Sequence, residues 1–553
     1  MNIPHSEYPR PQMVRDSYLC LNGTWNLRFL SDGDQATDQS ILVPFSPESA
    51  FSGVGRTLHD YETMLYSRHV EFPDVDFSKE RLLLHFGAVD YRAIVFIDKE
   101  QVTEHIGGYL PFTVEVDRSS FDLDVSVQDP GDSREISRGK QSSEPGGIWY
   151  PETSGIWQTV WMEKVPRTYI RELKILPDLN GFRISVLMND ESVNQAVLRI
   201  ESTEHVINTG EKQYIKIDDP HLWSPEDPHL YNFDISAGED KVSSYVGLRT
   251  FGIGPDKNGN NVLLLNNKPY FHHGLLDQGY YQGGYYTPAN DSDFVNDITR
   301  MKEMGFNTLR KHIKVEPLRW YYHCDRLGML VWQDMVSGGG KYNPAVIAAP
   351  LVLGSFLKDD RYEKFARKDV YEREVWEKET YGTVEHLYNC TSIAMWVPFN
   401  EGWGQFDSKR ITDNIRKIDG SRTIDHASGW HDQKIGDCRS LHVYFRPYRF
   451  KKDKLGRPVI LSEFGGYGKD LSFHEKKAFT YRKYSSIEDL TYGIVKLYEK
   501  QIMGAKRKGL AASIYTQVSD VEQEVNGLLS YDRKTVKVIP QVIADMSKRL
   551  LEE

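Results

Sequence analysis

Short alternating or continuous apolar runs, broken by Gly, Pro, Asp and Ser, fill the first part of the chain. Examples are Leu82-Leu-Leu-His-Phe86, Ala93-Ile-Val-Phe-Ile97 and Gln158-Thr-Val-Trp-Met162. Strands of this length with turn residues between them are typical of a two-sheet β-sandwich, and no apolar stripe at helical spacing competes with that interpretation. We therefore predict a β-sandwich or jelly-roll domain over residues 1–165.

A second stretch of strand patterns follows over residues 166–252. It includes Arg183-Ile-Ser-Val-Leu187 and Ala196-Val-Leu-Arg-Ile200, and a Pro-rich connection there carries one large aromatic residue, Trp223. Fewer than a hundred residues of this pattern predict a small immunoglobulin-like β-sandwich of about seven strands.

After Ile253 the pattern of apolar positions changes to one that predicts strands alternating with helices. Apolar residues recur at helical spacing from Phe294 to Met304 and from Leu318 to Leu327, and eight short apolar runs read as strands. Such alternation indicates parallel strands with crossover helices, so we predict a (β/α)8 TIM barrel over residues 253–553. The connections 427–439 and 445–457 are too short for full helices, which predicts an irregular barrel on that side. The charged stretch 358–388 is interpreted as a long surface helix plus an insertion.

Composition narrows the class of protein. With 553 residues the chain is too long for one core, and 39% hydrophobic and 12% aromatic residues are typical of well-packed globular domains. The net charge is −11, and no Lys/Arg cluster is interleaved with aromatic residues, which argues against a nucleic-acid or anionic-membrane partner. No apolar run of about 18 residues and no signal-peptide pattern occurs, so we predict a cytoplasmic protein.

Two glutamates carry the candidate chemistry. Glu401 follows the apolar run that ends in Val397-Pro-Phe-Asn400, and Glu463 follows Val459-Ile-Leu-Ser462. Glycoside hydrolysis needs one carboxylic acid to protonate the departing oxygen and one carboxylate at the anomeric carbon, and the carboxyl ends of barrel strands bring such groups together. A solvated loop carboxylate is the alternative for each residue. Their shared context, with Gly and aromatic residues close by, favours catalysis.

The chain resembles glycoside hydrolase family 2 over nearly its whole length. The similar segments occur in that family's order: Leu21-Asn-Gly-Thr-Trp25, Leu83-Leu-His-Phe-Gly-Ala-Val-Asp90, Gly107-Gly-Tyr-Leu-Pro-Phe112, Ser154-Gly-Ile-Trp-Gln158, Leu222-Trp-Ser-Pro-Glu-Asp-Pro228, Asn400-Glu401 and Ser462-Glu-Phe-Gly465. The segments 275–280, 309–317 and 331–334 also resemble a bacterial subgroup described as β-galactosidase-like. The resemblance implies the three domains already predicted, in the same order: a jelly-roll sugar-binding domain, an immunoglobulin-like sandwich and a catalytic TIM barrel.

The resemblance also implies roles for residues near the strand ends. Glu401 becomes the general acid/base and Glu463 the nucleophile. Asn400 is expected to donate to the sugar 2-hydroxyl, or else to orient Glu401 in its turn. Arg310 is expected to pair with Glu463 and keep it ionised, with a purely structural ion pair as the alternative.

Further strand-end residues are candidate sugar contacts, each with packing as its alternative. We expect His312 and His442 to bind hydroxyls, Tyr444 to donate to the nucleophile and Asp277 to bind a 4- or 6-hydroxyl. The other candidates are Asp334 and the stacking residues Trp403, Trp430 and Tyr515, of which Trp430 is favoured.

The predicted function is that of a retaining, exo-acting β-glycoside hydrolase, most similar to β-galactosidases. Gln278 stands where the family pattern has His, and no Asn-x-Lys element of the glucuronidase type is found near the end of the barrel. A β-mannosidase, β-glucuronidase, α-L-arabinosidase or non-catalytic carbohydrate-binding protein stays open, as does a homodimer. No cofactor or catalytic metal is expected, since the metal-ligand spacings and glycine-rich nucleotide loops are missing. A loosely held Mg²⁺ or Na⁺ stays open.

Overall fold

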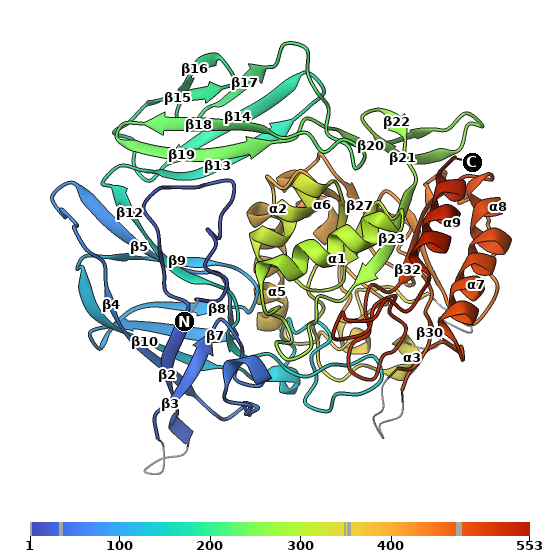
Figure 1. Ribbon diagram of the computed structural model, residues 1–553, viewed down its shortest axis with the longest axis horizontal. Helices are drawn as coiled ribbons and strands as arrows, with labels where there is room; N and C mark the ends of the chain where they lie inside the picture. The colour runs from blue at the N-terminus through green and yellow to red at the C-terminus, as the bar shows by residue number, and fades with distance from the viewer. Residues whose placement is uncertain (1–2, 32–36, 348–349, 351–355, 472–477, 553) are drawn as a thin grey trace.

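The computed structural model describes residues 3–31, 37–347, 350, 356–471 and 478–552. Figure 1 shows two β-sandwiches, one blue to teal and one green, beside a unit of mixed helices and strands that runs from yellow-green to red. This is the predicted multidomain fold: a jelly-roll sandwich, an immunoglobulin-like sandwich and a TIM barrel. The domain boundaries stay predictions.

The first sandwich is built from a four-stranded sheet, β1-β12-β5-β9, and a six-stranded sheet, β3-β2-β4-β10-β7-β8. Strands such as β10 alternate between buried and less buried positions, which is how one face of a sheet reaches a core. Trp25, Tyr66 and Leu84 lie in the core between the sheets. The strands are β1 Leu19–Cys20, β2 Gly23–Phe29, β3 Gln39–Val43, β4 Met64–Glu71, β5 Glu80–Phe86, β6 Val89–Asp90, β7 Arg92–Ile97, β8 Glu100–Ile106, β9 Phe112–Val116, β10 Ser120–Gln128, β11 Gly155–Ile156 and β12 Val160–Pro166.

The second sandwich pairs a three-stranded sheet, β13-β14-β17, with a four-stranded sheet, β16-β15-β18-β19. Trp223, in the connection between β17 and β18, is fully buried, and its Nε1 donates to Asp325 O at 2.7 Å, which fastens this sandwich to a barrel helix. The strands are β13 Ile170–Pro177, β14 Gly181–Met188, β15 Gln195–Ile200, β16 Thr203–Asn208, β17 Lys212–Lys216, β18 Tyr231–Ala237 and β19 Asp240–Val246, followed by the linking sheet β20 Phe251–Pro255, β21 Asn261–Leu265 and β22 Lys268–Pro269.

Eight strands form the barrel sheet in the order β27-β26-β25-β24-β23-β32-β29-β28. All neighbouring pairs are parallel, and within the described residues no pairing joins β27 to β28. The barrel is therefore open beside the two short connections, as predicted. Its strands are β23 His272–Asp277, β24 Thr308–Lys311, β25 Leu330–Asp334, β26 Ile393–Val397, β27 Thr423–Ile424, β28 Arg439–Val443, β29 Val459–Gly465 and β32 Leu510–Thr516.

Barrel strands such as β25, β26 and β32 are buried at every position, because helices cover their outer faces and side chains fill the barrel. The helix predicted within 358–388 is α5, and it is less exposed than expected. Trp376 of α5 is 2% exposed, and a Cβ on Gly382 would lie 2.5 Å from Leu110 of the first sandwich. The helices are α1 Asp291–Glu303, α2 Leu318–Leu327, α3 Pro344–Ile347, α5 Val370–His386, α6 Ser408–Ile418, α7 Ile487–Leu497, α8 Met503–Lys506 and α9 Pro540–Glu552.

A long segment between β10 and β11 leaves the first sandwich and lies against the carboxyl end of the barrel. Arg138 N and Gly139 N both donate to Ser337 O, at 3.0 and 2.8 Å, just beyond the end of β25. Farther along the segment, the Tyr150 hydroxyl donates to Glu524 in the loop after β32. The sandwich thereby forms part of the wall around the strand ends. In the part of the chain that the structure describes, no helix is long and apolar enough to cross a membrane.

Candidate active site

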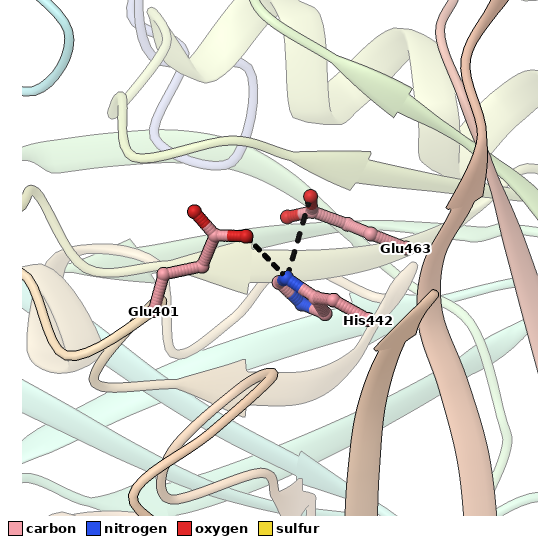
Figure 2. A group of neighbouring side chains, drawn as sticks. All are labelled: Glu401, His442 and Glu463. Carbon is pink, nitrogen blue, oxygen red and sulfur yellow. Dashed lines mark hydrogen bonds and ion pairs between the residues drawn. The ribbon is translucent and has the colours of Figure 1, made fainter. Parts of the chain in front are cut away.

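Glu401 and Glu463 meet at the carboxyl end of the barrel (Figure 2). Glu463 lies within β29, whereas Glu401 lies in the turn after β26, with a left-handed backbone (φ 52°) and its N donating to Ser428 O at 2.9 Å. A carboxylate oxygen of each glutamate and a ring nitrogen of His442 all lie within 4.8 Å of one another. That spacing is close to the roughly 5–5.5 Å of a retaining pair and well below the roughly 6.5–9.5 Å of an inverting pair.

His442 bridges the two glutamates. Its Nδ1 lies 2.8 Å from Glu401 Oε1 and 3.5 Å from Glu463 Oε2. Burial lowers the pKa of His442 to about 4, so the ring is neutral at pH 7. Because Nδ1 faces two carboxyl groups, we assign its proton there, which makes His442 a donor to Glu401. The ring packs so closely that a Cβ on Gly429 would lie 2.8 Å from it.

Arg310 is a fully buried cation that holds several groups at once. Its guanidinium donates twice to Asp334, at 2.9 Å each, and once to Glu463 Oε1 at 3.0 Å. It also donates to Asn400 Oδ1 at 2.8 Å, which fixes the Asn400 amide so that Nδ2 points away from Arg310 without a partner among the described residues. This arrangement leaves one amide donor next to Glu401 for a ligand.

His312 is oriented by Asp334. Its Nδ1 lies 2.8 Å from Asp334 Oδ2, and burial lowers the pKa of His312 well below its usual value. Asp334 accepts hydrogen bonds from Arg310, and we assign it as an acceptor from His312 as well, with the His312 proton on Nδ1. The Nε2 of His312 is therefore an acceptor, and no group among the described residues bonds to it.

The two glutamates differ in their surroundings. Burial raises the pKa of Glu401 to about 7, against the opposing charges of Lys140 and Arg310. Burial also raises the pKa of Glu463, but Arg310 and the Tyr444 hydroxyl, which donates to Oε2 at 2.5 Å, act in the other direction. Glu401 is thus placed to carry a proton near neutral pH, and Glu463 has donors ready for its ionised form.

The predicted stacking residues fall into two groups. Trp430 donates its Nε1 to Glu401 O at 2.8 Å and packs edge-on to His442, so it lies at the site. Trp403 lies 6.3 Å from the His312 ring and 5.2 Å from Trp149. Tyr515 is fully buried and packs on Phe464 and Tyr498, so it is a core residue and not a sugar platform.

Asp277 is placed differently from the other predicted residues. Its carboxylate accepts from Lys311 Nζ at 2.7 Å and from Gly279 N at 3.0 Å. Lys311 also binds Glu316 and lies over the Trp320 ring of α2, on the outer side of the barrel wall. Within the described chain no hydrogen bond or ion pair joins Asp277 to either catalytic candidate, so its expected contact with a 4- or 6-hydroxyl stays an untested prediction.

Sequence reasoning missed residues that complete the wall of the site. Lys140 and Tyr150 come from the sandwich segment, Tyr481 stacks on Tyr444 with centroids 3.8 Å apart, and Glu524 lies in the loop after β32. The strand-end rule could have identified Glu524, because that loop follows the eighth predicted strand. Nothing in the local pattern around Lys140 indicates that it reaches the barrel.

Glu401, His442 and Glu463 are also the one group of His, Cys, Asp and Glu side chains among the described residues whose donor atoms lie close enough to hold a metal ion. Two carboxylates and an imidazole suit Zn²⁺. The same atoms are needed for acid and nucleophile, so an ion there would compete with a glycoside.

A cavity of about 440 Å³ lies elsewhere, between the first sandwich and helices α1, α2 and α5, and neither glutamate lines it.

Comparison with known proteins identifies the family of the chain. A family profile described as "Glycosyl hydrolases family 2, TIM barrel domain" matches residues 258–539, and one described as "Glycosyl hydrolases family 2" matches residues 178–249. A β-glucuronidase of Streptococcus agalactiae is 22% identical over 429 residues, which are 71% of this chain and 68% of that protein. A β-galactosidase of Thermoanaerobacter pseudethanolicus is 25% identical over 393 residues, 65% of this chain. This chain spans 47% of the length of that galactosidase.

A solved structure extends the likeness to the whole chain. The crystal structure of a β-galacturonidase from Eisenbergiella tayi bound to galacturonate aligns over 98% of this chain and 99% of its own, with a TM-score of 0.74. The sequence identity is 17%, so this likeness concerns the fold.

Proposed function

The chain belongs to glycosyl hydrolases family 2, and on that premise we propose that it is a retaining, exo-acting β-glycosidase. The observation that carries the proposal is the pair of glutamates whose oxygens lie within 4.8 Å of each other in unlike surroundings. Glu463 attacks the anomeric carbon, and Glu401 protonates the departing oxygen. Glu401 then takes a proton from the water that releases the sugar, with retention of configuration.

The neighbouring residues support this division of roles. Arg310 and Tyr444 each donate to a different oxygen of Glu463, which stabilises the carboxylate before attack. The Asn400 amide has a free donor for the 2-hydroxyl, where a hydrogen bond gains strength as the oxocarbenium-like transition state forms. His442 donates to Oε1 of Glu401, and Oε2 of the same carboxyl group can carry the proton for the glycosidic oxygen.

The sandwich segment supports an exo mode of action. It lies across the strand ends near β24 and β25 and contacts the loop after β32, so the wall closes around one side of the glutamate pair. A closed wall suits a terminal sugar better than the middle of a polysaccharide. We favour a β-galactosidase-like activity. A β-glucuronidase activity is the second candidate, because several curated relatives, the Streptococcus agalactiae protein among them, carry that name and the aligned crystal structure is of a galacturonidase.

Two assays test the proposal. A panel of 4-nitrophenyl β-glycosides identifies the terminal sugar, and the matching 2-deoxy-2-fluoro glycosyl fluoride should inactivate the enzyme by labelling the peptide that contains Glu463. Mass spectrometry locates the label, and Glu463→Ala is the control that should take up none. Sugar binding without turnover or labelling would instead support a non-catalytic carbohydrate-binding protein.

A further inference from the structure

Lys140 is a buried cation whose charge is not satisfied by a hydrogen bond. Its side chain is 6% exposed, yet no hydrogen bond to a described residue holds its Nζ. The nearest carboxylate oxygen is Glu524 Oε2 at 3.8 Å, and the Tyr150 ring lies 5.2 Å away. Buried ammonium groups are normally hydrogen-bonded, so the free donors of Lys140 indicate a place for ligand oxygens.

The backbone fixes Lys140 at the mouth of the barrel. A Cβ on the preceding residue, Gly139, would lie 2.8 Å from Ile313 O, directly after His312 in the chain. The backbone of Lys140 itself is held by Tyr150, whose N donates to Lys140 O at 3.0 Å. Lys140 thus enters the site from the sandwich, beside the strand end that carries His312.

Glu524 is held by two hydrogen-bond donors, so its carboxylate oxygens act as acceptors. The Tyr150 hydroxyl donates to Oε2, and Asn526 Nδ2 donates to Oε1 at 3.0 Å. Its loop pairs with Phe479, two residues before Tyr481, and Tyr481 stacks on the Tyr444 ring that contacts the nucleophile. Lys140 follows Gly139, which packs on the backbone directly after His312, and the loop of Glu524 reaches the Tyr481–Tyr444 stack, so the pair borders the catalytic space.

The charges around this space leave no place for a further anion. Arg310 is shared between Asp334 and Glu463, and Lys140 is opposed by Glu524. With Glu401 protonated and His312 and His442 neutral, these two cations and three carboxylates carry a net charge of one negative unit. That charge complements the positive charge of an oxocarbenium-like transition state. A sugar carboxylate would add a second negative charge in a buried site, where like charges repel strongly.

We propose that Lys140 and Glu524 form a subsite for hydroxyl groups of the terminal sugar, with Lys140 donating and Glu524 accepting, and that this subsite selects neutral sugars over uronic acids. This inference rests on the proposed glycosidase function and names its substrate class. It assigns to this chain a preference opposite to that of the uronidases with the same fold.

Matched substrates test the preference. 4-Nitrophenyl β-galactoside and β-galacturonide differ only at C6, as do the β-glucoside and β-glucuronide. We expect wild-type kcat/KM to favour the neutral member of the better pair by about 100-fold or more, since a site built for hydroxyls rejects a mismatched polar group strongly. Equal rates, or faster hydrolysis of a uronide, would overturn the inference while leaving the glycosidase function intact.

Variants connect the preference to these two residues. Glu524→Gln should lower kcat/KM for the neutral sugar by about 10- to 100-fold and shift the neutral-to-uronide ratio towards the uronide. Lys140→Met should cause a similar loss without any gain on uronides. The exposed residues Glu522 and Lys341 give the matched controls Glu522→Gln and Lys341→Met, which should change neither value. Unchanged kinetics in both Glu524→Gln and Lys140→Met would refute the subsite.

A binding measurement separates this inference from the proposed function. Titration calorimetry with galactose and galacturonic acid, and with glucose and glucuronic acid, reads the preference without turnover, and thermal unfolding confirms that each variant is folded. Tighter binding of either neutral sugar, weakened in Glu524→Gln, would support the subsite even if no glycoside in the panel were cleaved. Tighter binding of a uronic acid would overturn it.

Discussion

Replacing Tyr444 with Phe removes one hydrogen bond from the nucleophile, together with the hydrogen bond between the same hydroxyl and Thr516 Oγ1 at 2.8 Å. The hydroxyl donates to Glu463 Oε2 at 2.5 Å, while the ring remains stacked on Tyr481. A hydrogen bond to a charged group contributes about 1.5–3 kcal/mol, and about 1.4 kcal/mol corresponds to one pKa unit. The pKa of Glu463 should therefore rise by roughly one to two units in Tyr444→Phe.

The sign of the effect follows from the role of Glu463. The nucleophile works ionised, so a higher pKa means that activity is lost at a higher pH as the pH falls. The acid limb of the pH profile of kcat/KM, which reports the free enzyme, should move up by roughly one to two units. The assay is initial-rate hydrolysis of the best 4-nitrophenyl glycoside, with nitrophenol quantified after quenching at high pH.

Tyr498→Phe is the matched control. Tyr498 is fully buried in the same barrel, and its hydroxyl has no hydrogen-bond partner among the described residues. Its loss should leave the acid limb in place. An unmoved or lowered acid limb in Tyr444→Phe would refute the idea that this hydroxyl stabilises the ionised nucleophile.

Four further outcomes are expected. Glu463→Ala should lower kcat by roughly 10⁴-fold or more without unfolding, and azide should partly restore turnover and give the inverted glycosyl azide; wild-type activity would remove Glu463 from its role. Because burial raises the pKa of Glu401 to about 7, its acid form is present below that pH and lost above it, so wild-type activity should fall as the pH rises through about 7. Glu401→Ala should abolish that limb and harm natural disaccharides far more than activated aryl glycosides, and equal losses on both would contradict the acid role. Proton NMR in the first minutes should show the β-anomer as first product, whereas a first-formed α-anomer would indicate an inverting pair.

The fold could be predicted from sequence because each domain has a distinct hydrophobic rhythm. Alternating runs in the first 252 residues form sandwiches with one buried face per sheet, and the short apolar runs after Ile253 form barrel strands, of which β25, β26 and β32 are buried at every position. The exposure of α5 could not be read in the same way. Its many charged residues suggested a surface helix, but Glu379 and Trp376 are buried, because the helix is enclosed by another domain.

The site was predictable where it depends on strand ends. Arg310, Asn400, His442 and Tyr444 all gather around the glutamate pair, since parallel strands deliver their carboxyl-terminal residues to one face. Contacts between distant segments were not predictable. Lys140 reaches the site only because Gly139 and Ser337 join two domains, and no periodicity encodes such a contact.

On the proposed roles of Glu401, Glu463 and Lys140, the segment between β10 and β11 separates catalysis from sugar choice along the chain. Glu463 lies in barrel strand β29 and Glu401 in the turn that follows β26, whereas Lys140 and Tyr150 lie on a long connection that belongs to no strand of the barrel. Long connections tolerate insertions and substitutions more readily than strands do. Changes of length or sequence within residues 129–154 can therefore alter which sugar is accepted while the reacting groups stay in place, so new specificities can arise in a domain that contributes neither the acid nor the nucleophile.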